Sequence, residues 1–358
     1  MTEYFFDKIR VSSNPQRSTL LIAFKQLHVT ERFPMNVLVL LPLSAAQKAR
    51  LEAGAPGAHF VYTADDSDVV NGAGLSLGAN IAPEQVAAAD VIVGNIPCEK
   101  LAAADNLKLL QLNSAGYDNY LTSGALSAKT VLASSVGAYG QAVSEHLFAM
   151  LLSLMKNLPT YRDGQHEHAW ADLGPVTTLR GAQVVVLGTG DIGSHFAQLC
   201  QAVGAHVTGV RRYLSTVPKG FESVHSMDEL PNLLPNADVV ASFLPSTKET
   251  RGLADADFFA AMKRGVFFVN GGRGDLADMD ALNAALRSGH LGGAALDVTS
   301  PEPLPQDSPL WDAPNAFITP HVSGGFHLST VLDNVVDIAA ENLRHLQTGE
   351  PIRNAVAR

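Results

Sequence analysis

The chain has 358 residues, of which 46% are apolar and 17% charged, a globular composition that excludes disorder of the whole chain. At roughly 100–200 residues per domain, this length predicts two or three domains. The formal net charge of −10 would repel a phosphate backbone, and no apolar run approaches the ~18 residues of a membrane span. We therefore expect neither a nucleic-acid partner nor a membrane partner.

Residues 1–34 differ in composition from the remainder. They carry five basic and three acidic side chains, and their short apolar run, 20–24, is below the ~7–15 residues of a signal peptide. We expect a poorly ordered N-terminal extension, with a targeting segment as the alternative. The two cysteines, Cys98 and Cys200, have no nearby cysteine partner, which argues against a disulfide framework and favours a reducing, cytoplasmic compartment.

From residue 35 onward, apolar runs alternate with alanine-rich segments. The runs are bounded by glycine, proline or aspartate, as short strands are, and the alanine-rich segments 44–53 and 98–104 suit helices. Strands separated by helices predict a parallel sheet with right-handed crossovers. The predicted strands of this half are 37–41, 59–63, 90–94, 107–112 and 131–134.

A long apolar helix is expected next, over 141–158, where Pro159 would stop it. A second alternating series follows, and an amphipathic helix over about 327–348 would end at Gly349. We expect an α/β protein of two Rossmann-like or flavodoxin-like parallel-sheet lobes, with ligands in the cleft between them. The predicted strands of this half are 183–188, 206–210, 237–244, 265–270, 293–298 and 316–319.

A glycine motif follows the first strand of the second series and precedes a predicted helix. Gly188 would allow a tight turn, Gly190 would let the backbone approach a pyrophosphate, and Gly193 would let helix and strand pack closely. The helix N-terminus would offer its unpaired N–H groups to the phosphates. The motif, which also contains Asp191 and Ile192, therefore predicts a dinucleotide site.

Two arginines follow the next strand, 206–210. An NAD site usually has an acidic residue here, about 20 residues after the glycines, which binds the ribose 2′-hydroxyl. Arg211 and Arg212 would instead attract a 2′-phosphate and could bind it in bidentate fashion. We therefore predict NADP as the preferred cofactor over NAD. The alternative interpretation is that both arginines are solvated loop charges.

Three polar segments come directly after the last three predicted strands, at the edge that faces the ligand crevice. They contain Arg273, Glu302 and His321. Together with the glycine motif, in this order and spacing, they make residues 36–348 resemble the D-isomer-specific 2-hydroxyacid dehydrogenases. Glyoxylate/hydroxypyruvate reductase-like members are the nearest in motif. The segments read Asn270-Gly-Gly-Arg-Gly-Asp275, Asp297-Val-Thr-Ser-Pro-Glu-Pro-Leu-Pro305 and Thr319-Pro-His321.

The resemblance implies catalytic roles for these three side chains. Arg273 would hold the substrate carboxylate and polarise the 2-keto oxygen, because a guanidinium is always charged and forks onto planar oxygens. His321 would protonate that oxygen as hydride reaches C2, and Glu302 would orient the imidazole and raise its pKa. The implied reaction is the NAD(P)H-dependent reduction of a small 2-keto acid to the D-2-hydroxy acid, and its reverse.

The resemblance also implies further contacts, domain boundaries and a homodimer built on the long helix. The domains would be the extension 1–34, a substrate-binding domain of 35–136 plus 326–358, and an NAD(P)-binding domain of 137–325. The turn after strand 107–112 would hold the substrate carboxylate with its N–H groups. The implied substrate contacts are Asn95, Ser114, Ala115, Gly116 and Arg273, and the implied cofactor contacts beyond the glycine motif and the two arginines are Pro245, Thr250 and Asp297.

Two departures and two alternatives accompany the resemblance. Arg211 replaces the usual acidic residue, and Thr299 stands where many members have an aromatic side chain. The same fold serves as a dinucleotide-sensing corepressor and as a phosphite-type dehydrogenase. No metal is expected, because His166 and His168 have no acidic or cysteine cluster to complete a site.

Overall fold

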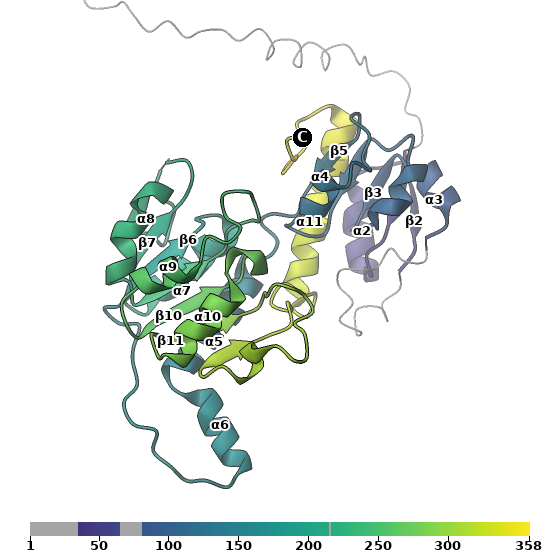
Figure 1. Ribbon diagram of the computed structural model, residues 1–358. Helices are drawn as coiled ribbons and strands as arrows, with labels where there is room; N and C mark the ends of the chain where they lie inside the picture. Colours follow the sequence, from purple (N-terminus) through teal and green to yellow (C-terminus); the bar gives the residue numbers. More distant parts are fainter. Residues whose placement is uncertain (1–34, 65–80, 215) are drawn as a thin grey trace, which may run out of the picture.

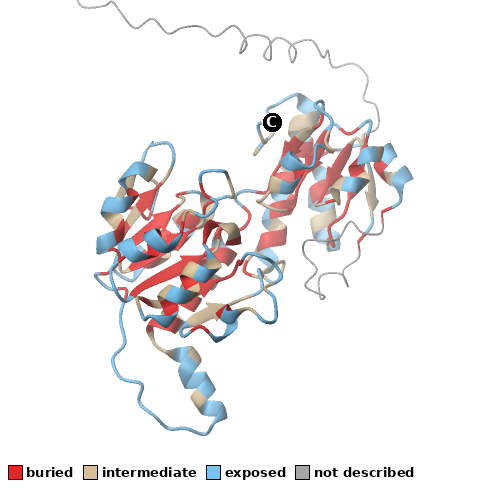
Figure 2. Cartoon of the chain, in the orientation of Figure 1, coloured by how far each residue is buried: buried red, intermediate tan, exposed pale blue. Residues whose placement is uncertain are grey.

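The computed structural model describes residues 35–64, 81–214 and 216–358, which form two α/β lobes (Figure 1). The predicted N-terminal extension lies outside the described residues. Each lobe is built around a parallel sheet, one of five strands and one of seven, which confirms the predicted fold class. Figure 2 shows buried residues along the strands and exposed residues on the outer faces of the helices.

The first sheet has the order β2-β1-β3-β4-β5. Side chains of β1 alternate between two apolar clusters: Val37 and Val39 belong to one, and Leu38 belongs to the other. A strand covered on both faces needs apolar residues at every position, which explains the continuous run in the sequence. The strands are β1 (Asn36–Val39), β2 (His59–Tyr62), β3 (Val91–Val93), β4 (Leu109–Gln111) and β5 (Val131–Ala133), and the helices are α2 (Ala45–Ala53), α3 (Pro83–Ala88), α4 (Asp118–Thr122) and α11 (Ser329–Thr348).

The second sheet has the order β12-β11-β10-β9-β6-β7-β8. The chain runs outward from β6 to β8 and then returns to the other side of β6, so the topological switch point lies between β6 and β9, where such folds bind ligands. The strands are β6 (Gln183–Leu187), β7 (His206–Val210), β8 (Ser223–His225), β9 (Val239–Ser242), β10 (Val266–Asn270), β11 (Leu291–Leu296) and β12 (Ala316–Ile318).

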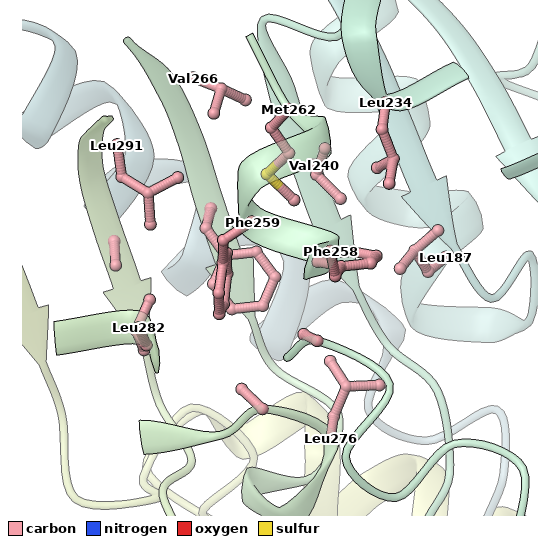
Figure 3. Close-up of a cluster of buried hydrophobic side chains, with 14 of the residues drawn as sticks. Leu187, Leu234, Val240, Phe258, Phe259, Met262, Val266, Leu276, Leu282 and Leu291 are labelled. Atoms are coloured by element: carbon pink, nitrogen blue, oxygen red, sulfur yellow. The ribbon is translucent and has the colours of Figure 1, made fainter. Parts of the chain in front are cut away.

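Helices cover both faces of this second sheet. On one face, the phenyl rings of Phe258 and Phe259 pack on β9 and β10 in a cluster with Leu187 (Figure 3). On the other face, Phe196 of α7 is fully buried. The longer helices of this lobe are α5 (Gly140–Met155), α7 (Asp191–Ala202), α9 (Ala256–Ala261) and α10 (Met279–Arg287), with a four-residue α8 (Leu230–Leu233).

The chain passes between the lobes twice. Helix α5 makes the first passage: Ala142 and Val143 pack in the core of the first lobe, whereas Leu147 and Leu151 pack in the core of the second. The chain returns after β12, and α11 packs beside α2, with Arg50 2.5 Å from Asp333. The predicted boundary at 136/137 lies just before α5, and the one at 325/326 lies between β12 and α11; both stay predictions.

Two local expectations differ from the structure, and one strand was not predicted. The long helix ends at Met155, and Pro159 lies in the first turn of a new helix, α6 (Leu158–His166). The reason is that Asn157 takes a left-handed conformation, with φ of +57°, and a first-turn proline lacks only an N–H that would be unpaired anyway. Segment 98–104 forms a 3₁₀ helix over Cys98–Ala103, and the edge strand β8 had no apolar run to predict it.

None of the helices within the described ranges is long and apolar enough to cross a membrane.

Candidate active site

Arg273, Glu302 and His321 follow β10, β11 and β12, which are neighbours in one parallel sheet. Their carboxyl ends therefore share one edge, and the three side chains converge there. Nδ1 of His321 lies 2.8 Å from Oε2 of Glu302. Oε1 of Glu302 accepts the backbone N–H of Thr299 at 3.0 Å, so both carboxylate oxygens are held.

The contact between His321 and Glu302 shifts both pKa values. The hydrogen bond to Glu302, opposed by partial burial, raises the pKa of His321 above its usual value. Burial alone would raise the pKa of Glu302, but the hydrogen bond and the charge of His321 outweigh it and lower that pKa. The pair is therefore an imidazolium beside a carboxylate over a wider pH range than either group alone would allow.

Asp297 holds the loop that carries His321. Its carboxylate is 2% exposed and accepts the Thr319 hydroxyl at 2.7 Å, the N–H of Val322 at 3.0 Å, and both the hydroxyl and N–H of Ser323. Its carbonyl accepts the N–H of His321 at 2.8 Å. The structure shows that Asp297 holds the loop of His321. The implied contact of Asp297 with the cofactor stays a prediction.

His146 of α5 extends the same chain of hydrogen bonds. A carboxylate cannot donate, so the hydroxyl of Thr319 donates to Asp297 and must accept from His146 Nε2, 3.1 Å away. This direction assigns a proton to Nε2 of His146. Helix α5 is thereby connected to the loop of His321.

Arg273 lies against the turn that was predicted to hold the substrate. Its Nη1 donates to the carbonyl of Gly272 at 2.9 Å, and its Nε lies 3.4 Å from Oδ2 of Asp118. A Cβ added to Gly116 would overlap Nη2 of Arg273. The structure therefore brings the predicted carboxylate clamp and the predicted turn together, although they belong to different lobes.

Asn95 supports that turn. Its N–H donates to Asn113 Oδ1 at 2.6 Å, and its own Oδ1 accepts the hydroxyl of Ser114 at 3.3 Å. The N–H groups of Ala115 and Gly116 donate to no other residue in the described part of the chain. Two donors are therefore available for a carboxylate, and Asn95 is placed as a support of the turn as well as a predicted substrate contact.

The glycine motif has the geometry that a dinucleotide needs. Gly188 has φ of +94°, and a Cβ on Gly193 would overlap the carbonyl of Gly188. A Cβ on Gly190, which caps α7, would meet nothing within 4 Å, so the backbone there faces open space. The predicted pyrophosphate contact at Gly190, at the N-terminus of α7, would therefore meet no obstructing side chain, and it stays a prediction.

Other predicted cofactor contacts surround this motif. Ile192 packs against the core of the first lobe. Asp191 turns its carboxylate toward Gly140 and lies 3.4 Å from His195, so its backbone rather than its side chain would face a phosphate. Thr250 donates to the carbonyl of Pro245 at 2.6 Å, which fixes the loop after β9.

Arg211 and Arg212 differ in their surroundings. Arg212 lies 3.5 Å from Glu249 and over the ring of Tyr213, and its side chain is 57% exposed. The side chain of Arg211 contacts no acidic residue in the described ranges within salt-bridge distance. Sequence reasoning missed Glu249, as it missed Asp118 and His146, because no local pattern indicates these contacts.

Comparison with known proteins identifies the family. Residues 148–323 match the family model for the NAD-binding domain of the D-isomer specific 2-hydroxyacid dehydrogenases. A family member from Aeromonas salmonicida, of solved structure, is 33% identical, with a TM-score of 0.77 over 91% of this chain and 99% of that one. The chain belongs to this family. It is accordingly an NAD(P)-dependent oxidoreductase that acts on 2-hydroxy acids.

Other relatives bear on cofactor and substrate. A hydroxypyruvate reductase from Blautia hydrogenotrophica is 30% identical over 74% of this chain and 84% of its own length. A family member from Xanthobacter autotrophicus, solved with NADPH, is 30% identical, with a TM-score of 0.72 over 90% of this chain and 98% of its own. An NADPH-dependent glyoxylate/hydroxypyruvate reductase from Sinorhizobium meliloti, solved with NADP, is 26% identical, with a TM-score of 0.72 and the same two coverages.

The chain spans about half the length of the D-3-phosphoglycerate dehydrogenases that it matches; the one from Mycobacterium tuberculosis is 33% identical over 73% of this chain and 49% of its own.

Proposed function

We propose that the protein reduces a small 2-keto acid to the D-2-hydroxy acid, and catalyses the reverse reaction, with NADP preferred over NAD. The observation that carries the proposal is the 2.8 Å contact between His321 and Glu302 at the strand edge that also presents Arg273. The relatives named as hydroxypyruvate and glyoxylate/hydroxypyruvate reductases make these two keto acids the first candidate substrates.

In this proposal each residue performs one task. Arg273 and the N–H groups of Ala115 and Gly116 bind the substrate carboxylate. Because Nδ1 of His321 is engaged by Glu302, the proton is transferred from Nε2 to the 2-keto oxygen. A bound nicotinamide dinucleotide would supply the hydride that C2 receives, so the carbonyl becomes a hydroxyl group and the imidazolium becomes neutral. Glu302 stabilises the imidazolium before the transfer.

The proposed cofactor preference rests mainly on Arg211. Its guanidinium has no carboxylate within salt-bridge distance in the described ranges, whereas Glu249 engages Arg212. A 2′-phosphate would bind to Arg211 and would compete with Glu249 for Arg212. The NADPH and NADP complexes of two relatives support this assignment.

The test is the initial rate of NADPH and NADH oxidation with glyoxylate, hydroxypyruvate, pyruvate and phenylpyruvate. We expect turnover of at least one keto acid with NADPH, and we expect Arg211→Asp to move the preference toward NADH. Cofactor binding without turnover of any keto acid would favour a dinucleotide-sensing corepressor. Reduction of NADP⁺ by phosphite would favour the phosphite-type alternative.

We further propose that the protein is a cytoplasmic homodimer. The segment from α6 to residue 176 projects from the second lobe (Figure 1), and Thr177 rejoins that lobe by donating its N–H to the carbonyl of Met155. It exposes large apolar side chains, including Trp170, which is fully exposed, and Leu158 at 52%. Burial of this apolar surface would be favourable, and a second copy of the chain could bury it.

A further inference from the structure

Asp118 supplies the carboxylate that Arg273 contacts among the described residues. The two side chains are about one-third exposed, at 30% and 33%. Asp118 is the first residue of α4 in the first lobe, whereas Arg273 follows β10 in the second lobe. The ion pair therefore crosses from the lobe with the carboxylate turn to the lobe with the cofactor motif.

Three contacts determine the direction of the guanidinium. Nη1 donates to the carbonyl of Gly272, Nε faces Asp118, and Nη2 lies against Gly116. A guanidinium is planar and rigid, so holding Nε and Nη1 determines where Nη2 points. It points at the turn that contains the available N–H groups of Ala115 and Gly116.

We propose that Asp118 is a positioning residue that holds Arg273 by its Nε edge, so that Nη2 faces a substrate carboxylate in the 114–116 turn. This inference rests on the proposed function, in which Arg273 and the turn bind that carboxylate. Asp118 does not attract the substrate: its charge and that of the substrate carboxylate repel each other. Its contribution is the geometry of the clamp.

Two substitutions of Asp118 distinguish the effect of its hydrogen bond to Arg273 from the effect of its charge. The amide oxygen introduced by Asp118→Asn would still accept a hydrogen bond from Nε, whereas Asp118→Ala would leave Nε without its acceptor. We expect Asp118→Ala to raise KM for the keto acid about tenfold, the size of one lost charge-assisted hydrogen bond, with a smaller change in kcat. Asp118→Asn should recover most of this loss, and the Kd for NADPH should be the same in all three proteins.

The experiment measures KM and kcat with hydroxypyruvate, and the Kd of oxalate, a dicarboxylate probe, for the enzyme with bound NADP⁺. Asp105→Ala, at an exposed aspartate of the same lobe, is the matched control. An unchanged KM and oxalate Kd in Asp118→Ala would overturn the proposal, as would equal losses in the Ala and Asn variants or a parallel loss of NADPH affinity. If the wild type reduces no keto acid, the proposed function fails, and oxalate binding still tests Asp118.

Discussion

The backbone of His321 is left-handed, with φ of +51°, which is uncommon for a residue other than glycine. The surrounding hydrogen bonds keep it there: its N–H donates to the carbonyl of Asp297, and the next two N–H groups donate to the carboxylate of Asp297. The imidazole is thus aimed by its backbone and oriented by Glu302. Local strain held in this way is common at catalytic residues.

The pH dependence of the reduction follows from this pair. In the proposed reaction, reduction needs protonated His321, and the pKa of His321 is raised, so the rate of keto-acid reduction should fall as pH rises through that raised pKa. Glu302→Gln removes the negative charge that stabilises the imidazolium. We expect the falling limb of kcat/KM against pH to move to lower pH in this variant.

In the same proposed reaction, hydroxy-acid oxidation needs neutral His321, so its rate should rise with pH where the rate of reduction falls. His321→Asn should lower kcat by roughly 10²- to 10⁴-fold at any pH, the range for loss of a general acid. If Glu302→Gln is active and the falling limb of its kcat/KM profile lies at the same pH as in the wild type, the assignment of that limb to His321 is contradicted.

Gly116 is a second residue with a testable consequence. A methyl group at this position would overlap Nη2 of Arg273, the mobile end of a long side chain, so Gly116→Ala should displace the guanidinium and leave the fold intact. We expect a rise in KM for the keto acid of about tenfold, with little change in the thermal midpoint. Gly164→Ala on α6, whose Cβ would meet only ordinary contacts, is the control.

At the scale of elements, the loop 319–323 connects α5 to His321, the proposed general acid. Thr319 lies between Asp297 and His146, and its hydroxyl is the only part of its side chain that bonds to both. Thr319→Val, which keeps the shape and loses the hydroxyl, should lower kcat about tenfold and leave the Kd for NADPH unchanged. Thr319→Ser should stay within about threefold of the wild type, because the hydroxyl remains. Equal activity of the Val and Ser variants would contradict this coupling.

The elements that the sequence predicts best are those with a local signal. Apolar runs bounded by turn residues predicted each strand of the two sheets except β8, whose residues Ser223–His225 are half-buried and mixed in polarity. The end of α5 was misplaced, because Pro159 is equally compatible with a helix stop and with a first turn, and only the left-handed Asn157 distinguishes the two.

The residues of the candidate site likewise fall into those with a local sequence signal and those without one. The glycine motif, Arg273, Glu302 and His321 stand in recognisable segments, so sequence reasoning singled them out as candidates. Asp118 and His146 did not stand out, because their partners Arg273 and Thr319 are 155 and 173 positions away. Contacts of that separation exist only once the two lobes have formed, and no periodicity along the chain encodes them.

At the scale of the whole molecule, the exposed segment from α6 to residue 176 predicts the state of assembly. Sedimentation equilibrium at micromolar concentration should give twice the 37.9 kDa of one chain. Trp170→Asp places a charge on the most exposed large apolar side chain and should shift the equilibrium toward monomer. Val203→Asp, which is also at an exposed apolar position, should leave the mass unchanged, and a monomeric wild type would contradict the homodimer.

The passage of the chain between the lobes sets an order of assembly during translation. Strand β5 ends at Ala133, but α11, which supplies Val331 and Val335 to the core under the same sheet, begins at Ser329. At about 5–20 residues per second, the ribosome needs roughly 10–40 s to make the intervening chain. All strands of the second lobe emerge in that interval. In each newly made molecule, the lobe that recognises the cofactor can therefore be complete before the lobe that began first.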